Sequence, residues 1–309
     1  MTIFDIDAYI KKAEEVLKFA GRSQNTISSY KTYLIPFLRH CMDDLHKEPD
    51  QVSYEERRAF LLKIKEERHL SDATFNHAIS EIRFFYEVVL ELPWNPRLMP
   101  HRKLKHTIKF VPSREMVETF IASIDDLKMK AVISLLYCGG LRISELCTLK
   151  CSDIRKAINR IRVAPGKTGR EHFTLLADEA YEVLCEYWRN LPRDMKTRDW
   201  LFTQQTNVSK HMDPEYVRQF IKKQLALLGW PEQLTPHVFR HAFATHSFES
   251  GKTVDEICEF LGHSNPESTR LYINSALIAL KHHDSPMHGM NLSKKPRSTP
   301  SKDTPEDKE

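Results

Sequence analysis

The feature that most limits the fold of this chain is a proline-rich break near residue 96. Pro93, Pro96 and Pro100 stand within eight residues, and proline cannot continue a helix because its ring fixes φ and removes the backbone N–H. The apolar pattern is purely helical before the break and mixed after it. A length of 309 residues also suggests roughly two domains. We predict a helical domain at 1–94, a basic linker at 95–112, a second domain at 113–283 and a tail at 284–309.

The first domain is predicted to contain helices only. Its apolar residues recur three and four positions apart, as on one face of an α-helix. In the second run, the predicted buried face carries Tyr30, Tyr33, Leu34, Phe37 and Leu38. The expected helices cover 6–19, 25–41, 54–67 and 72–90, which gives a small four-helix domain.

The second domain is predicted to combine many helices with a small antiparallel sheet. Strand patterns at 158–163 and 173–176 flank a segment rich in Gly and Pro, which indicates a hairpin. The fold class is therefore mainly α. The tail has no buried pattern and is expected to be disordered. Helices are expected at 114–138 (two helices, closed by Gly139-Gly140), 142–149, 178–190, 214–228, 236–250, 253–261 and 266–273.

Composition excludes a membrane protein and a secreted one. Hydrophobic residues make up 41% and charged residues 28%, a globular balance. No apolar run approaches the roughly 20 residues of a membrane span, and no secretory signal is visible. We therefore expect a cytoplasmic protein whose six cysteines are reduced thiols. Cys147 and Cys151 are four apart, but no second pair accompanies them, so a zinc site is not favoured.

Positive charge is concentrated in two stretches. Between Arg97 and Arg114 there are six Lys or Arg and no acid, and between Lys150 and Arg170 there are seven against the single acid Asp153. Such stretches in a nearly balanced chain favour a surface for a polyanion. Solvated loops carry similar charge about as often, so charge alone does not decide between the two.

A group of histidine and arginine residues between 236 and 272 points to chemistry. His237 and Arg240 are three positions apart in a predicted helix, so they share a face and could present an imidazole and a guanidinium to one oxyanion. Gly262 ends the next predicted helix and places His263 just beyond it.

A rival hypothesis makes three histidines of this segment metal ligands. His237 and His241 are four apart, as in zinc metalloproteases, and His246 follows. Those enzymes need a glutamate after the first histidine, where this chain has Val238. A metal site is therefore not favoured, and taken singly each histidine is better explained by a structural role.

The order and spacing of these residues resemble the tyrosine recombinases, also called the phage integrase family. Their separations match the family, with 95 residues from Arg142 to His237, 23 from Arg240 to His263 and 9 from His263 to Tyr272. The likeness covers about residues 5–280. The motifs that resemble the family are Gly140-Leu141-Arg142-Ile143-Ser144-Glu145-Leu146, His237-x-x-Arg240, Leu261-Gly262-His263 and Tyr272 in the second domain, with Asn25-Thr26-Ile27-x-x-Tyr30 and Thr74-Phe75-Asn76-x-x-x-x-x-Ile82-Arg83-x-Phe85-Tyr86 in the first.

The resemblance implies a SAM-like DNA-binding domain followed by a catalytic domain that cuts and rejoins DNA. Tyr272 would attack the scissile phosphorus and form a 3′-phosphotyrosyl link, without a metal ion, ATP or another cofactor. Arg142 and Arg240 would hold the non-bridging oxygens, because a guanidinium donates two parallel hydrogen bonds and stays charged. His263 would add a further donor, and Glu145 would brace the site.

The resemblance also assigns the proton transfers and the DNA contacts. His237 would take up the tyrosine proton or position the hydroxyl, and Lys167 would protonate the departing 5′-oxygen. The turn around this lysine departs from the family's usual Gly-Lys-Gly, since the chain reads Gly166-Lys167-Thr168-Gly169. The residues expected to contact DNA are Arg102, Lys103, Lys105 and Arg170.

The short segment before the first helix leaves no room for an extra arm-binding domain, so the chain resembles a compact, Xer-like recombinase. The expected partners are double-stranded DNA with paired inverted repeats and further copies of the chain in a tetrameric synapse. A helix at 275–283 would dock onto a neighbouring protomer, and a second recombinase or an accessory protein is a further candidate partner. The alternative function is a DNA-binding regulator that keeps this fold without the chemistry.

Overall fold

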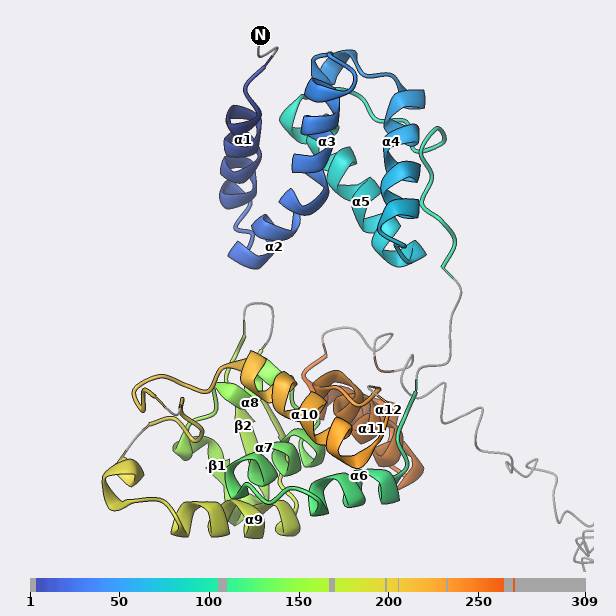
Figure 1. Cartoon of the computed structure of the whole chain (residues 1–309). Helices are drawn as coiled ribbons and strands as arrows, with labels where there is room; N and C mark the ends of the chain where they lie inside the picture. Colours follow the sequence, from blue (N-terminus) through green and yellow to red (C-terminus); the bar gives the residue numbers. More distant parts are fainter. Residues whose placement is uncertain are drawn as a thin grey trace, which may run out of the picture. The chain divides into compact units, whose positions relative to one another are not determined.

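The computed structural model describes residues 4–104, 110–166, 170–197, 199–204, 206–231, 233–263 and residue 269. They form two compact units, which divide between Thr107 and Ile108 (Figure 1). None of the described helices is long and apolar enough to cross a membrane. Three predicted features lie outside the described residues: the docking helix at 275–283, the tail at 284–309 and all but one residue of the helix at 266–273.

The regular elements in the described part of the first unit are all helices, as predicted. Its core is built on aromatic residues, with Phe37 fully buried in edge-to-face contact with Phe60 and Tyr86. The predicted helix at 54–67 has the bounds that the structure shows. The helices are α1 (Ile6–Phe19), α2 (Gln24–Ser29), α3 (Lys31–Asp43), α4 (Tyr54–Glu67) and α5 (Asp72–Phe84), with a 3-10 turn at Pro49–Gln51 and a π-helical turn at Phe85–Val89.

The prediction of a single helix at 25–41 is wrong, because the structure has two helices there, α2 and α3, which meet at Tyr30. The α3 helix has no capping side chain of its own. Glu81 of α5 takes that role, since its Oε2 accepts a hydrogen bond from the backbone N–H of Tyr33 at 2.8 Å. A carboxylate near the first turn of a helix satisfies amides that have no partner within the helix. The break therefore depends on a contact between segments 48 residues apart.

The burial of Glu81 is expected to make the stability of the first unit depend on pH. Its side chain is fully buried, and burial raises its pKa to about 7, although the amides of Tyr33 and Leu34 lower it. The folded state therefore holds a proton between about pH 4.5 and 7 that the unfolded state has released. The free energy of unfolding should rise as the pH falls through this window, by up to about 3 kcal/mol at ~1.4 kcal/mol per pKa unit.

The change Glu81→Gln should remove this rise. We would measure urea unfolding of the full chain at pH 5, 6, 7 and 8 by pulse labelling of Cys41, a buried thiol of the first unit. The change Glu55→Gln, at a side chain that is 76% exposed, is the matched control. An unchanged pH dependence in Glu81→Gln would contradict the assignment.

Residues 95–102, predicted as the start of the linker, pack on the first unit. Met99 is buried in its core. The side chain of Asn76 donates to the backbone oxygen of Arg102 at 2.9 Å and accepts from its backbone N–H at 2.7 Å. The Arg102 guanidinium lies 3.2 Å from the Asp72 carboxylate and 4.8 Å from the centre of the Phe75 ring. Arg102, the first Lys or Arg after Pro100, is thus fixed to the first unit.

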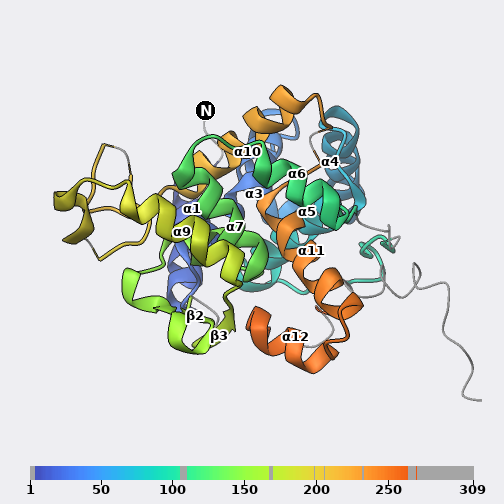
Figure 2. The same ribbon diagram turned by 90° about the horizontal axis from the view of Figure 1, so that it is seen from below.

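The second unit is arranged around α7, which packs against α6, α9 and α11 (Figure 2) and also against α8. Seven of its residues, from Met129 to Leu136, are buried, as expected of a helix that is apolar on nearly all sides. The helices are α6 (Arg114–Ala122), α7 (Leu127–Cys138), α8 (Ile143–Cys147), α9 (Asp178–Arg189), α10 (Pro214–Leu228), α11 (Pro236–Glu249) and α12 (Val254–Leu261), with 3-10 turns at Cys151–Asp153, Lys156–Ile158 and Arg193–Thr197.

The predicted hairpin is present within a three-stranded antiparallel sheet of order β1-β2-β3. The strands are β1 (Ile154–Arg155), β2 (Arg160–Val163) and β3 (His172–Leu175). The predicted start at 158 is wrong, because residues 156–158 form a 3-10 turn that Asn159 closes with a φ of 51°. β1 was not predicted, since a strand of two residues has no alternation to detect. In the register, Val163 faces His172, so the turn predicted to carry Lys167 joins these two residues.

Candidate active site

The first predicted motif places Arg142 and Glu145 at the start of α8. The Glu145 carboxylate accepts the Arg142 backbone N–H at 2.7 Å and the Arg142 guanidinium at 2.5 Å. The preceding Gly140 has a φ of +57°, and a Cβ there would lie 2.3 Å from the Phe243 ring. Only glycine allows this close approach, so the packing on α11 fixes where the Arg142 segment runs.

Arg240 lies at the centre of the site and is only 2% exposed. Its Nη1 donates to the backbone oxygen of Gly140 at 2.8 Å, and its Nη2 donates to that of Leu261 at 2.6 Å. Nη2 is also 2.8 Å from Nε2 of His263, and Nη1 is 3.6 Å from the Glu145 carboxylate. One guanidinium of α11 therefore joins the loop before α8 to the end of α12.

His263 is held in one tautomer by its two neighbours. α12 ends at Gly262, which has a φ of +59° and turns the chain so that His263 follows. A guanidinium only donates, so Nε2 of His263 accepts from Arg240, and Nδ1 then donates to the hydroxyl of Thr269 at 2.7 Å. Burial, together with the charges of Arg240 and Arg142, lowers the pKa of His263 to about 4. The imidazole is therefore neutral at neutral pH.

The cluster of Arg142, Arg240, Glu145 and His263 has surplus positive charge. Its two guanidinium groups share one carboxylate, and the imidazole is neutral, so the sum of formal charges is +1. The Arg142 side chain is 44% exposed, whereas Arg240 is buried beneath. A buried positive charge that is only partly neutralised favours an anion, and paired N–H groups suit phosphate oxygens. The geometry therefore fits a phosphate group.

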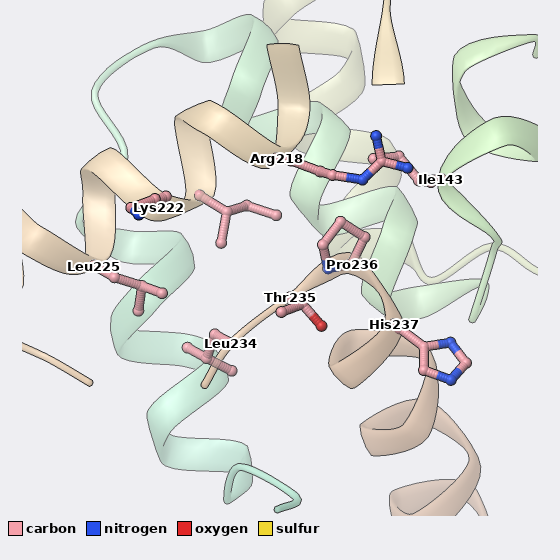
Figure 3. A pocket seen from close by; sticks show the side chains of 9 residues that line it. Ile143, Arg218, Lys222, Leu225, Leu234, Thr235, Pro236 and His237 are labelled. Carbon is pink, nitrogen blue, oxygen red and sulfur yellow. The ribbon is translucent and has the colours of Figure 1, made fainter. Parts of the chain in front are cut away.

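His237 lies at the first turn of α11, three residues before Arg240. It is exposed, and its ring meets that of His241 edge to face at 4.4 Å. It also lines one end of a pocket of about 430 Å³ between α10 and α11, with Leu225 and Leu234 at the apolar end (Figure 3). The role of His237 stays a prediction.

Several predicted site residues lie outside the described residues. These are Lys167, Tyr272 and Lys105. The stem that leads to the lysine turn is described, and there Arg162 donates to Asp153 at 3.0 Å and to Glu171 at 2.7 Å. Arg102, Lys103 and Arg170 are exposed, as a phosphate contact requires.

The rival metal hypothesis gains no support from the described residues. Among them, no group of three or more His, Cys, Asp or Glu side chains is placed to hold a metal ion. The imidazole of His246 instead forms a hydrogen bond with the hydroxyl of Tyr137 at 2.8 Å. All six cysteines are free thiols, and burial raises the pKa of Cys147 to about 12.

One residue beside the site was not predicted. His172, the first residue of β3, packs its ring against Gly262, the residue before His263. The sequence offers a weak signal, since His172 follows the basic turn that contains Lys167. Nothing local predicts its contact with a segment so far along the chain.

Family comparisons agree with the motifs and the geometry. The model of the phage integrase family matches residues 111–277, and the model of the phage integrase N-terminal SAM-like domain matches residues 9–96. The chain belongs to the phage integrase family. The matched segments contain the Arg142 motif, the Arg240 and His263 motifs and Tyr272. This confirms the resemblance that the sequence motifs indicated.

Relatives in the family narrow the subgroup. The chain is 31% identical to a putative integrase/recombinase, y4qK, of Sinorhizobium fredii, over 96% of this chain and 92% of the relative. It is 29% identical to the tyrosine recombinase XerD of Oceanobacillus iheyensis, over 84% and 91%. The solved structure of the XerH recombinase with its difH substrate after cleavage has the same fold, with a TM-score of 0.71 and 18% identity over 88% of this chain and 82% of that one. The chain is an Xer-like tyrosine recombinase, an enzyme that acts on DNA.

Proposed function

We propose that this enzyme cuts and rejoins DNA through a covalent link between Tyr272 and the 3′-phosphate of the cut strand. The observation that carries the proposal is the positively charged cluster, in which Arg142, Arg240 and His263 come together from three segments. Thr269 bonds to His263, and three residues later Tyr272 is at most about 11 Å along the chain from it. This short separation in the sequence supports Tyr272 as the nucleophile for a phosphate held by the cluster.

In the proposed reaction, the Tyr272 oxygen attacks the phosphorus while the bond to the 5′-oxygen breaks. His237 accepts the phenol proton, and Lys167 gives a proton to the leaving 5′-oxygen. The two guanidinium groups stabilise the charge that gathers on the phosphate oxygens. A 5′-hydroxyl of another strand then attacks the link and releases the tyrosine. One phosphate ester replaces another at each step, so neither ATP nor a metal ion is required.

The proposed substrate is duplex DNA with paired inverted repeats, bound by a tetramer of this chain in the cytoplasm. Arg102, Lys103, Lys105 and Arg170 would contact phosphates, which makes the affinity fall with rising salt concentration. The surface pair of Arg102 with Asp72 would compete only weakly with such a contact, since exposed pairs contribute little.

A covalent trap tests the proposal directly. Duplexes that the full chain binds are selected from a random pool, nicked near the centre of the bound site, and incubated with the enzyme in excess chelator and without ATP. After cleavage, the nick lets a short fragment with the 5′-hydroxyl diffuse away, so the link is not resealed and the covalent adduct accumulates. The adduct is quantified on a denaturing gel. We expect an adduct whose modified peptide contains Tyr272. Tight binding without an adduct would indicate a DNA-binding regulator, and an adduct that the chelator abolishes would indicate a metal-dependent enzyme.

A further inference from the structure

The ring of His172 lies directly on the turn that presents His263. β3 packs against α12 in the second unit, and His172 is the first residue of β3. A Cβ placed on Gly262 would lie 2.5 Å from both Cε1 and Nδ1 of His172 and 2.9 Å from its Cγ. The imidazole therefore contacts the backbone of Gly262 itself, one residue before His263.

Among the described residues, no hydrogen bond of normal length holds the His172 imidazole. Its Nε2 is buried and has no hydrogen-bond partner among the described residues. Its Nδ1 meets the backbone oxygen of Arg170 at 3.4 Å, which is long for a hydrogen bond. A buried polar atom without a partner costs roughly 1–3 kcal/mol. Among the described residues, the His172 ring is therefore held mainly by packing. Any effect of the ring on Gly262 is exerted through van der Waals contact.

The imidazole of His172 is favoured in its neutral form, which suits a position beside the positively charged cluster. Burial lowers the pKa of this imidazole, and Arg240 and Arg142 lower it further, although the Arg170 carbonyl and Glu145 raise it. A neutral ring fills the space behind Gly262 without adding a third positive charge to Arg240 and Arg142.

We propose that His172 is a positioning residue, whose ring holds the Gly262 turn so that Nε2 of His263 meets Arg240. The left-handed turn at Gly262 has freedom that a residue with a Cβ would lack, and the ring removes it. The catalytic imidazole then stays on the guanidinium instead of sampling other positions. This inference rests on the proposed function, because it assigns His263 to the reacting phosphate.

The test compares cleavage rate with DNA affinity. With the nicked duplex at saturation, His172→Ala should lower the single-turnover rate of adduct formation by about 10- to 100-fold, the usual cost of a displaced catalytic group. The DNA dissociation constant should change by less than about twofold. The change His172→Phe keeps a flat ring without nitrogens, so it should recover most of the lost rate. Equal rates for His172→Ala and the unchanged chain, or a weaker DNA affinity that accounts for the whole loss, would overturn the inference.

A double-mutant cycle separates positioning from general damage. If the ring acts only through His263, then His172→Ala should slow the chain that carries His263→Ala by less than about twofold. Additive losses would overturn the inference, because they would show a separate route. Should His172→Ala unfold, His172→Leu, which fills the space without a flat ring, replaces it in both experiments. If the unchanged chain formed no adduct, the proposed function itself would be wrong. If His172→Ala formed the adduct at the rate of the unchanged chain, only this inference would be wrong.

Discussion

The change Arg240→Ala is expected to lower the single-turnover rate of adduct formation by on the order of 1000-fold. The guanidinium provides charge for the phosphate and also bonds the backbone oxygens of Gly140 and Leu261 and the imidazole of His263. Its loss removes the charge and the hydrogen bonds that join these three segments. The buried oxygens would also lose their donor, at roughly 1–3 kcal/mol each, so the midpoint of thermal unfolding of the second unit should fall.

The change Arg240→Lys separates the contribution of the positive charge from that of the hydrogen bonds. An ammonium keeps the charge but lacks the planar fork that reaches both backbone oxygens, so we expect a rate between those of Arg240→Ala and the unchanged chain. Arg189→Ala, at an exposed arginine of α9, is the control for loss of one positive charge. Rates of Arg240→Ala and Arg189→Ala that agree within tenfold would contradict the role of Arg240.

The change Tyr272→Phe is expected to abolish the covalent adduct while leaving DNA affinity within about twofold. Phenylalanine lacks the oxygen that attacks phosphorus, and no other group in the proposed scheme makes this bond. Gel-shift titration measures the affinity, and the denaturing gel measures the adduct on the same nicked duplex. Tyr181→Phe, in α9, controls for the loss of a phenol oxygen. An adduct formed by Tyr272→Phe at the unchanged rate would show that another residue is the nucleophile.

Local patterns were sufficient where a segment's neighbours lie within it. The helix predicted at 214–228 has the bounds of α10, because Asp213 caps its first turn and Gly229 ends it with a φ of +65°. Both signals are residue preferences that act within one turn of a helix. Ser53 and Glu56 cap α4 in the same way.

Local patterns failed where the deciding partner is distant. The interruption at Tyr30 depends on Glu81, which approaches α3 from another helix. The start of β2 at Arg160 was missed for a local reason instead. It depends on a left-handed Asn159 and on pairing with β1 a few residues before, and neither leaves a periodic signal.

The sequence by itself determined the family and the identities of the candidate catalytic residues, because the order and spacing of chemically distinctive side chains survive without any knowledge of the fold. Only the tertiary structure decided how those side chains are held. Arg240 is buried on two backbone oxygens, His263 is neutral in a single tautomer, and the His172 ring packs against Gly262, the residue before His263. Each of these depends on the desolvation and close packing that arise when distant segments meet, and a linear pattern of residue types does not encode such distances.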